Sequence, residues 1–216
     1  MHRTISLGRC SMAVALATIL LTSPTAGFAQ LGGLLPFPPA ATSSTVVGDA
    51  SAARVSVLGI LGTATTTALA DTGTLTTANN ALDASMLAGG IPSALSAETL
   101  SASTISWADQ VDSEASLGNL SMTVAGVGIT ADFVMAEASQ VLGAAGSGSS
   151  TLTNLVINGT PIAVTGAPNQ AVWIPGGQVI LNEQTISSTG AVVNALHVVV
   201  TGVADVVVAS ATAGVS

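Results

Sequence analysis

The stretch VILNEQTISSTGAVVNALHVVVTGVADVVVASATAGV, residues 179–215, decides the fold of this chain. Two runs rich in valine and alanine, 192–201 and 206–213, flank the segment Gly202-Val203-Ala204-Asp205. β-Branched residues favour strands, and a short glycine-containing segment between two such runs predicts a hairpin. Both runs are apolar on both faces, so we expect them to be central in a sheet and covered on both sides.

Two further hairpins are predicted upstream of this stretch. Asn158-Gly159 separates two β-branched runs, and both residues tolerate the positive φ that tight hairpin turns need. Pro175-Gly176-Gly177 is expected to join AVWI to QVILNEQ. Each hairpin places its two strands antiparallel and adjacent.

Residues 125–135 alternate with period two, which is typical of a strand with one buried face. The face predicted to be buried carries Ala125, Val127, Ile129, Ala131, Phe133 and Met135. By contrast, 78–97 is predicted to be a loop with a short helix, because Leu82, Met86 and Leu87 have helical spacing and Gly89-Gly90 would end a helix.

The composition supports strands as well. Aromatic residues make up only 2% of the chain and charged residues 6%, and the sequence is rich in Ala, Val, Thr, Ser and Gly. Thr and Val suit strands, whereas exposed helices need Lys, Glu, Gln and Arg. Many short strands separated by turns predict an all-β, antiparallel, β-sandwich-like single domain. The alternative is a β-solenoid, although no repeat of fixed period is visible.

The first residues have the features of an export signal. Arg3 and Arg9 accompany an uncharged apolar stretch at 12–21, which is too short to span a bilayer. Gly27-Phe28-Ala29 fits the small-x-small pattern of signal peptidase, so we expect cleavage after Ala29. The single cysteine, Cys10, would leave with this segment.

These features predict three parts of the chain. They are a signal peptide at 1–29, a flexible lead-in rich in proline and glycine at 30–45, and a β-rich domain at 46–216. We expect a Sec-type route, no transmembrane span in the mature chain, and a secreted, extracellular or periplasmic location.

After that cleavage, Arg54 would be the one cation against eleven carboxylates, a net charge of −10. A surface of that charge repels phosphate backbones, which excludes nucleic acid as an expected partner. It also disfavours anionic membranes. A component of the cell envelope or surface is the partner that we expect.

The order of several segments resembles the choice-of-anchor P family of bacterial exported proteins. They are NLVINGTPI from Asn154, an APN…V…PGG stretch, VILNEQ, NALHVVV and DVVVASATAG. The resemblance is most specific over 154–214. It implies a secreted, strand-rich domain that occurs with different C-terminal surface-attachment signals, and it implies no enzymatic activity, cofactor or catalytic residue.

His197 is the one histidine of the expected mature chain, so it would carry any histidine-dependent catalysis. With Asp205 and a nearby serine it would form a triad. No Gly-x-Ser-x-Gly elbow accompanies it, and a neutral imidazole bonded to a carbonyl is the commoner outcome on a strand. We therefore expect a protein that is not an enzyme and that needs no cofactor.

Asp109, Asp112 and Glu114 form the best candidate metal site, for calcium, because hard cations take several oxygen ligands. Asp112 and Glu114 are expected on one strand face, and a solvated acidic face is the alternative reading. Glu183 is expected to pair with Arg54 or to protect a sheet edge.

The threonine-rich run 63–77 has threonines at strand spacing, which would suit binding to an ordered surface. The sequence thus predicts a non-enzymatic exported structural or interaction module. The alternative is a carbohydrate- or surface-binding protein that uses a threonine-rich or acidic sheet face.

Overall fold

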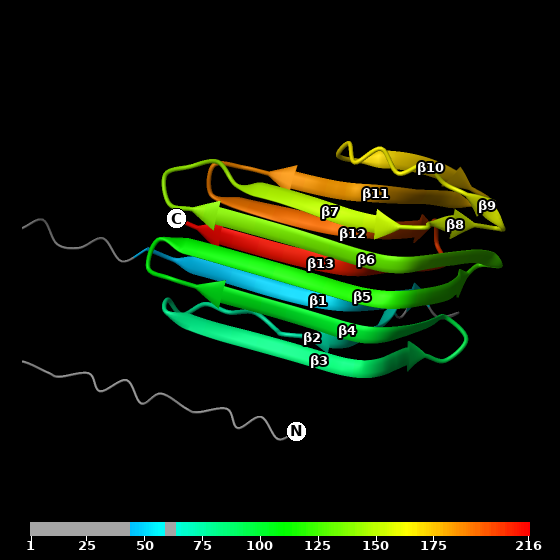
Figure 1. The fold of residues 1–216 in the computed structure, drawn as a ribbon, viewed down its shortest axis with the longest axis horizontal. Helices are drawn as coiled ribbons and strands as arrows, with labels where there is room; N and C mark the ends of the chain where they lie inside the picture. Colours follow the sequence, from blue (N-terminus) through cyan, green and yellow to red (C-terminus); the bar gives the residue numbers. More distant parts are fainter. Residues whose placement is uncertain (1–43, 59–63) are drawn as a thin grey trace, which may run out of the picture. The chain divides into compact units, whose positions relative to one another are not determined.

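The computed structural model describes residues 44–58 and 64–216, which are built from thirteen β-strands (Figure 1). The predicted signal peptide, 1–29, and residues 30–43 of the predicted lead-in lie outside the described residues. Within the described ranges there is no helix, and so none with the length and apolarity to cross a membrane.

Six strands form sheet A, in the order β10-β11-β12-β13-β1-β2. In chain order they are β1 (Val46–Leu58), β2 (Ala64–Asp71), β10 (Gln170–Ile174), β11 (Gly177–Ile186), β12 (Gly190–Val200) and β13 (Ala204–Val215).

The other seven strands form sheet B, in the order β3-β4-β5-β6-β8-β9, with β7 also paired to β6. They are β3 (Asn80–Ile91), β4 (Leu95–Ser106), β5 (Gln110–Val124), β6 (Val127–Val141), β7 (Ser147–Thr153), β8 (Val156–Ile157) and β9 (Thr160–Pro161).

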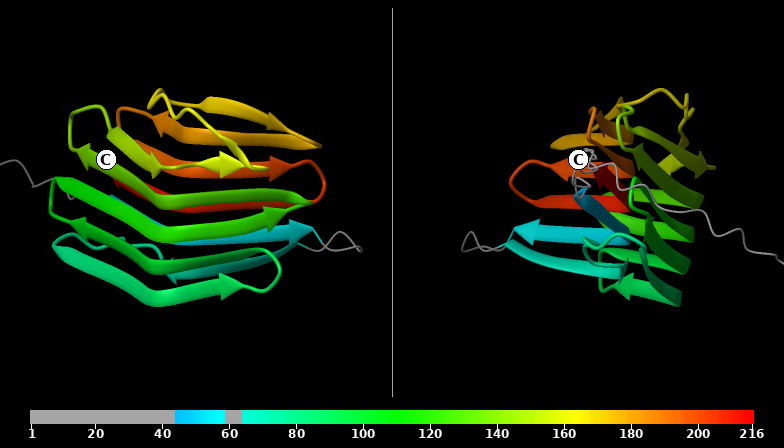
Figure 2. Two further views of the ribbon diagram at one scale, coloured as in Figure 1. Left: turned by 45° about the vertical axis from the view of Figure 1, so that its right-hand side comes forward. Right: turned by 90° about the vertical axis from the view of Figure 1, so that its left-hand side faces the viewer.

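The two sheets pack face to face, as Figure 2 shows from the side, and every strand pairing is antiparallel. The predicted all-β, sandwich-like fold is therefore confirmed. A β-solenoid, the alternative, stacks parallel strands in successive coils, and the described residues do not have that arrangement. The fold has two open outer faces on which functional side chains can be displayed.

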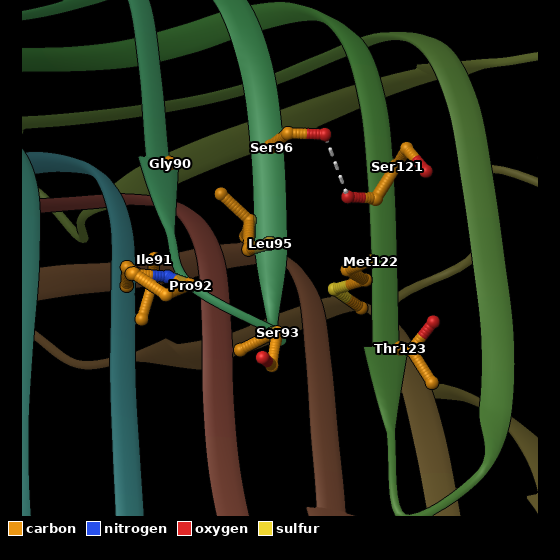
Figure 3. Close-up of a pocket in the computed structure, with 10 residues that line it drawn as sticks. Gly90, Ile91, Pro92, Ser93, Leu95, Ser96, Ser121, Met122 and Thr123 are labelled. Atoms are coloured by element: carbon orange, nitrogen blue, oxygen red, sulfur yellow. Dashed lines mark hydrogen bonds between the residues drawn. The ribbon is translucent and has the colours of Figure 1, made fainter.

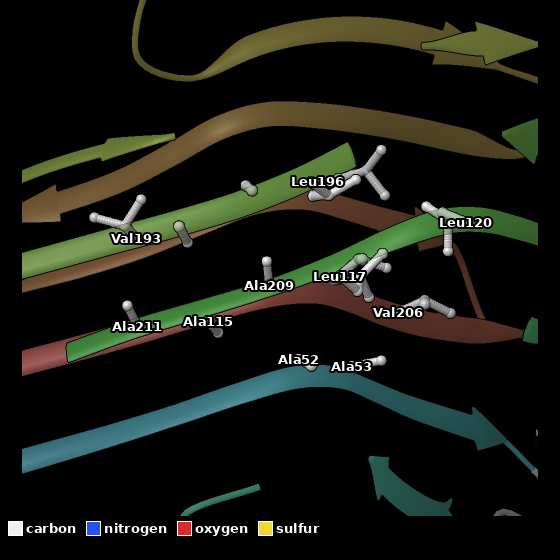
Figure 4. Close-up of a cluster of buried hydrophobic side chains, with 14 of the residues drawn as sticks. Ala52, Ala53, Ala115, Leu117, Leu120, Val193, Leu196, Val206, Ala209 and Ala211 are labelled. Atoms are coloured by element: carbon white, nitrogen blue, oxygen red, sulfur yellow. The ribbon is translucent and has the colours of Figure 1, made fainter. Parts of the chain in front are cut away.

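Alanine, valine, leucine and isoleucine fill the space between the sheets (Figure 4). Leu117 and Leu120 of sheet B pack over a layer of small residues of sheet A that includes Ala52, Ala53 and Ala209. Each leucine that is fully buried contributes roughly 1.5–3 kcal/mol relative to the exposed side chain. Large residues on one sheet and small ones on the other let the layers interdigitate without voids.

Both sheets bend at one level across their strands, which is visible in Figure 2. In sheet A, Asn194 pairs with Ser210 and Leu196 pairs with Val208 in the same register, but the two residues between these pairs are not paired with each other. Ala209 in that gap has φ of 53°, and Asn182 and Ala70, at the same level on β11 and β2, have φ of 51° and 44°. Left-handed residues at one level turn the whole sheet.

At the bend, the strict alternation of inward-facing and outward-facing side chains along each strand is interrupted. On β12, Ala195 and Leu196 are consecutive and both fully buried. The predicted buried face is confirmed for Val127, Ile129 and Ala131 on β6, but Ala125 is exposed in the turn before β6, and the prediction is also wrong after Ala131. Phe133 is 36% exposed and Val134 is buried, because two consecutive residues face outward at the bend.

The three predicted hairpins are confirmed. Asn158 and Gly159, with φ of 49° and 76°, form the turn between β8 and β9. Ile174 pairs with Gly177, so Pro175-Gly176 is the turn between β10 and β11. The third hairpin joins β12 to β13 through residues 201–203.

Two predictions about elements are wrong. Residues 80–91 form β3 instead of a loop with a short helix, because Leu82 and Met86, four residues apart, share a strand face as well as they would a helix face. β12 and β13 are central in sheet A as predicted, but only one face of each is buried. Val192, which faces outward on β12, is 38% exposed.

Candidate functional site on the outer sheet faces

The outer face of sheet A carries the polar residues that the sequence singled out. Cross-strand pairing puts Ile180, His197, Val207 and Arg54 in one row across four adjacent strands. The interrupted alternation at the bend is what turns His197 outward, because Leu196 and Val198 on either side of it are fully buried.

His197 lies between two carboxylates. Its Nδ1 is 2.8 Å from Glu183 Oε2 on β11, and its Nε2 is 3.2 Å from Asp205 Oδ1 at the start of β13. The Asn194 side-chain amide donates to the same Glu183 oxygen at 2.7 Å. The partners of the imidazole are thus carboxylates and not the carbonyl that we expected.

The structure brings His197 and Asp205 together, as the triad hypothesis required, but in the described residues both hydrogen bonds of the imidazole go to carboxylates and none to a serine. A general base needs one ring nitrogen facing the serine hydroxyl while the other faces the acid. Here both nitrogens face carboxylates, so the ring orients side chains across three strands.

Arg54 does not pair with Glu183, so that prediction is wrong. Its guanidinium is 3.0 Å from Asp71 on β2 and 3.4 Å from Asp49 on its own strand, β1. Glu183 is on β11, which is separated from β1 by β12 and β13, and its carboxylate contacts His197. The nearer carboxylates on β1 and β2 therefore take the guanidinium.

The pKa of Asp71 lies below its ordinary value. Partial burial acts to raise this pKa, but hydrogen bonds from the Gly73 backbone N–H and the Arg54 guanidinium outweigh it. Arg54 and the Ser51 hydroxyl further favour the ionised form. Asp71 therefore stays charged to more acidic pH than a free aspartate.

The outer face of sheet B carries the acidic cluster predicted from the sequence. Asp112 and Glu114 do share one face of β5, as expected. Asp109 lies in the exposed turn before β5, outside the groove that the other two line. The structure thus brings two of the three predicted metal ligands onto one surface.

The third carboxylate of this surface is Glu137 on β6, which the sequence reading missed. Register pairs Glu137 with Glu114, and its carboxylate accepts a 2.8 Å hydrogen bond from the Ser149 hydroxyl. We call this surface the acidic groove. It is an open hollow of about 470 Å³ and comprises Asp112, Glu114 and Glu137 with Ser103, Ser139, Ser147 and Ser149.

Two glutamates directly opposite each other on neighbouring strands repel, which costs stability. Asp112 is occupied by the Gln110 amide, which donates to it at 2.8 Å. Across residues 44–58 and 64–216, no three His, Cys, Asp or Glu side chains are grouped closely enough to hold a metal ion. Calcium at Asp109, Asp112 and Glu114 stays a prediction.

A hollow of about 530 Å³ lies at the β3–β4 turn and is shown in Figure 3. Ile91, Pro92, Leu95 and Met122 supply its apolar wall. Its polar groups are hydroxyls and backbone, with Ser96 donating to the Ser121 carbonyl at 3.4 Å. No titratable side chain lines it, so it offers shape without acid–base chemistry.

The threonine-rich run does not form one face. Thr65 and Thr67 lie on edge strand β2, but Thr72, Thr74 and Thr76 follow the end of that strand at Asp71. Thr63 lies outside the described residues. The Thr72 hydroxyl is used locally, donating to the Gly73 carbonyl at 2.8 Å and accepting from the Ala50 backbone N–H at 3.0 Å.

The sequence alone assigned no functional role to the aromatic side chains. The described ranges contain Trp107, Phe133 and Trp173, which are 43%, 36% and 79% exposed. Aromatic residues usually dominate cores because each buries a large apolar area. The sequence offered one signal for these positions: it contains enough leucine, valine and alanine to fill a core without aromatic residues. The chain matches no protein-family model, no curated protein and no solved structure.

Proposed function

We propose that this protein is a non-enzymatic exported module of the bacterial cell surface or secretome, which works by displaying its outer sheet faces to a partner. The single observation that carries the proposal is the position of the polar side chains. His197, Glu183, Asp205 and Glu114 lie on the outer faces of the two sheets, where the hollows that Asp205 and Glu114 line are open to solvent.

Two further features support this proposal. Both nitrogens of His197 are taken by carboxylates, which leaves the ring a role in orienting side chains. The extracellular part of the proposal is supported by the export-signal features of 1–29 and by the resemblance to the choice-of-anchor P family. Eleven carboxylates against one arginine in the described residues keep such a surface soluble and away from anionic polymers.

Fractionation of the native producer tests this proposal. We expect the protein in the medium, periplasm or envelope, with Gln30 as the first residue by N-terminal sequencing. Intact, unprocessed chain in the cytosol would refute it. As a control, a cytosolic marker enzyme must be absent from the fractions that contain the protein.

A second candidate function is binding of carbohydrate or another surface through the acidic groove. The observation that favours it is the pairing of Glu114 with Glu137, since like charges kept opposite each other cost stability. A hydroxyl-rich or cationic ligand would relieve that repulsion and find serine hydroxyls on both sides. Glu114→Gln with Glu137→Gln should abolish such binding, and unchanged binding would exclude the groove.

Calcium is the cation that the sequence predicts for this region. Binding of calcium by Asp109, Asp112 and Glu114 predicts a melting temperature that rises in millimolar calcium and falls again with chelator. Glu114→Gln should abolish the rise. A melting temperature that ignores both calcium and chelator removes the metal prediction.

A further inference from the structure

We infer that the outer face of sheet A is a binding platform for an uncharged polysaccharide, with Trp173 as the residue on which a sugar ring stacks. The inference rests on the proposed function, because it supplies the partner that an exported module would contact. It concerns a different face from the acidic groove.

Trp173 is 79% exposed on β10. Leaving an indole in water forgoes one of the largest apolar burials available to a side chain. The core of the described structure contains no aromatic residue at all, so an aromatic side chain was not needed there. An exposed indole is available to pack against a partner.

Trp173 begins a row of side chains that crosses the whole of sheet A. Successive register pairs place them on six neighbouring strands, in the order Trp173, Gln178, Val199, Asp205, Ser56 and Thr66. Since neighbouring strands lie about 4.8 Å apart, the row extends over roughly 24 Å. An extended glycan chain repeats at a similar interval, so several of its rings fit along the row.

The row has the chemistry that sugars require. An indole face packs against the C–H groups of a pyranose ring, while hydroxyls need both donors and acceptors. Gln178 offers a carboxamide, and Ser56 and Thr66 offer hydroxyls that are 2.8 Å apart. Val199 between them supplies a low apolar surface. No side chain of the row is cationic, which leaves sulfate or uronate groups without a counter-ion.

The hydrogen bonds of His197 fix one side chain of this row, Asp205, before a ligand binds. His197 Nε2 holds the Asp205 carboxylate at 3.2 Å, while Glu183 fixes the opposite side of the ring. Asp205 is still 56% exposed, so its carboxylate can accept a hydrogen bond from a sugar hydroxyl without first losing rotamer freedom. His197 is a positioning residue in this scheme and not a catalytic one.

The charge of the protein selects the class of glycan. One arginine faces eleven carboxylates in the described residues, so polymers with uronate, sulfate or phosphate groups are repelled. Ser56, Val199 and Asp205 of the row line one open hollow of about 400 Å³, and the row continues beyond it on both sides, which suits an extended chain better than a single monosaccharide. Neutral glucans and N-acetylated glycans meet both conditions.

Fluorescence of a single-tryptophan variant tests the inference. Trp107→Phe leaves Trp173 as the sole tryptophan of the chain, because the sequence has two. Cellohexaose, chitohexaose and laminarihexaose are titrated separately into this variant. We expect at least one of them to shift the Trp173 emission to shorter wavelength with a saturable dependence on concentration.

Matched variants then locate the site by calorimetry with the active hexasaccharide. Trp173→Ala should weaken binding at least about tenfold, whereas Trp107→Ala, in the turn between β4 and β5, should change it less than about twofold. Gln178→Ala and Asp205→Asn should each weaken it by a few fold. Trp173 is so exposed that its removal should leave the melting temperature unchanged.

Three results would overturn the inference: no response of Trp173 to any of the three hexasaccharides, unweakened binding by Trp173→Ala, or binding lost only in the Glu114→Gln and Glu137→Gln variants. The last result would assign the sugar to the acidic groove. None of them affects the fractionation experiment, so an exported protein without this platform remains distinguishable from a protein that is not exported.

Discussion

The Ser113 hydroxyl on β5 donates a 2.6 Å hydrogen bond to the Thr212 carbonyl on β13, and this bond links the two sheets through the core. Ser113 has one hydroxyl proton, so the Thr104 hydroxyl, 2.7 Å away on β4, must be the donor to Ser113 Oγ. Both side chains are buried, so this chain of bonds is shielded from water.

Replacement of Ser113 by alanine should therefore destabilise the protein by about 1–3 kcal/mol, because the Thr104 hydroxyl and the Thr212 carbonyl lose a buried partner. Urea unfolding measures the difference. Ser101→Ala, an exposed change on β4, should stay within about 0.5 kcal/mol. Equal stability of the two variants would show that the link between the sheets contributes nothing.

Gly148 allows β7 to approach β12 closely. A Cβ at this position would collide with Val193 Cγ2 and lie 3.0 Å from the Glu137 carbonyl oxygen. Gly148→Ala should cost about 1–3 kcal/mol by overpacking, and adding Val193→Ala should restore part of the loss. Gly128→Ala on β6 is the control, since nothing lies within 4 Å of its Cβ and it should be nearly neutral. Thermal unfolding of the four proteins distinguishes these outcomes.

Asn119 on β5 has the left-handed backbone conformation at the bend of sheet B. It is exposed and has φ of 48°, a conformation that β-branched residues avoid. Asn119→Val should lower stability by about 1–3 kcal/mol, and Asn119→Gly should be close to neutral. Ser121→Val, two residues along the same exposed face, should be harmless because strands favour valine. A harmless Asn119→Val would contradict the left-handed bend.

Asp71 makes stability depend on pH. Its pKa in the folded protein lies below the ordinary value of 3.8, so its contribution is complete above about pH 4 and is lost as the pH falls through the folded pKa. Melting temperatures of the protein and of Asp71→Asn should differ by a constant amount above that pH and converge below it. In an Arg54→Ala background, the difference in melting temperature above that pH should be smaller, because the guanidinium that favours the ionised Asp71 is gone.

Glu114 and Glu137 repel each other across β5 and β6. Glu114→Gln should raise stability by a few tenths of a kcal/mol at low ionic strength, and the gain should diminish in high salt as screening weakens the repulsion. Chemical unfolding at two salt concentrations measures it. Loss of stability in Glu114→Gln would mean that the carboxylate makes a favourable contact instead.

The amino-acid sequence by itself determined the strands and the turns that have a local cause. Asn158-Gly159 and Pro175-Gly176 form hairpins because these residues accept the backbone angles of tight turns. The face shared by Asp112 and Glu114 follows from the period of two along a single strand. These features need no information from distant residues.

Only the tertiary structure decided where that period is interrupted and which side chains meet. The bend lies where Ala52, Ala195 and Ala209 of three neighbouring strands are at one level, all three fully buried between the sheets. Glu137 reaches Glu114, and His197 reaches both Glu183 and Asp205, through the register of whole strands. Register is a property of paired strands, because each cross-strand contact joins residues that a single strand cannot bring together.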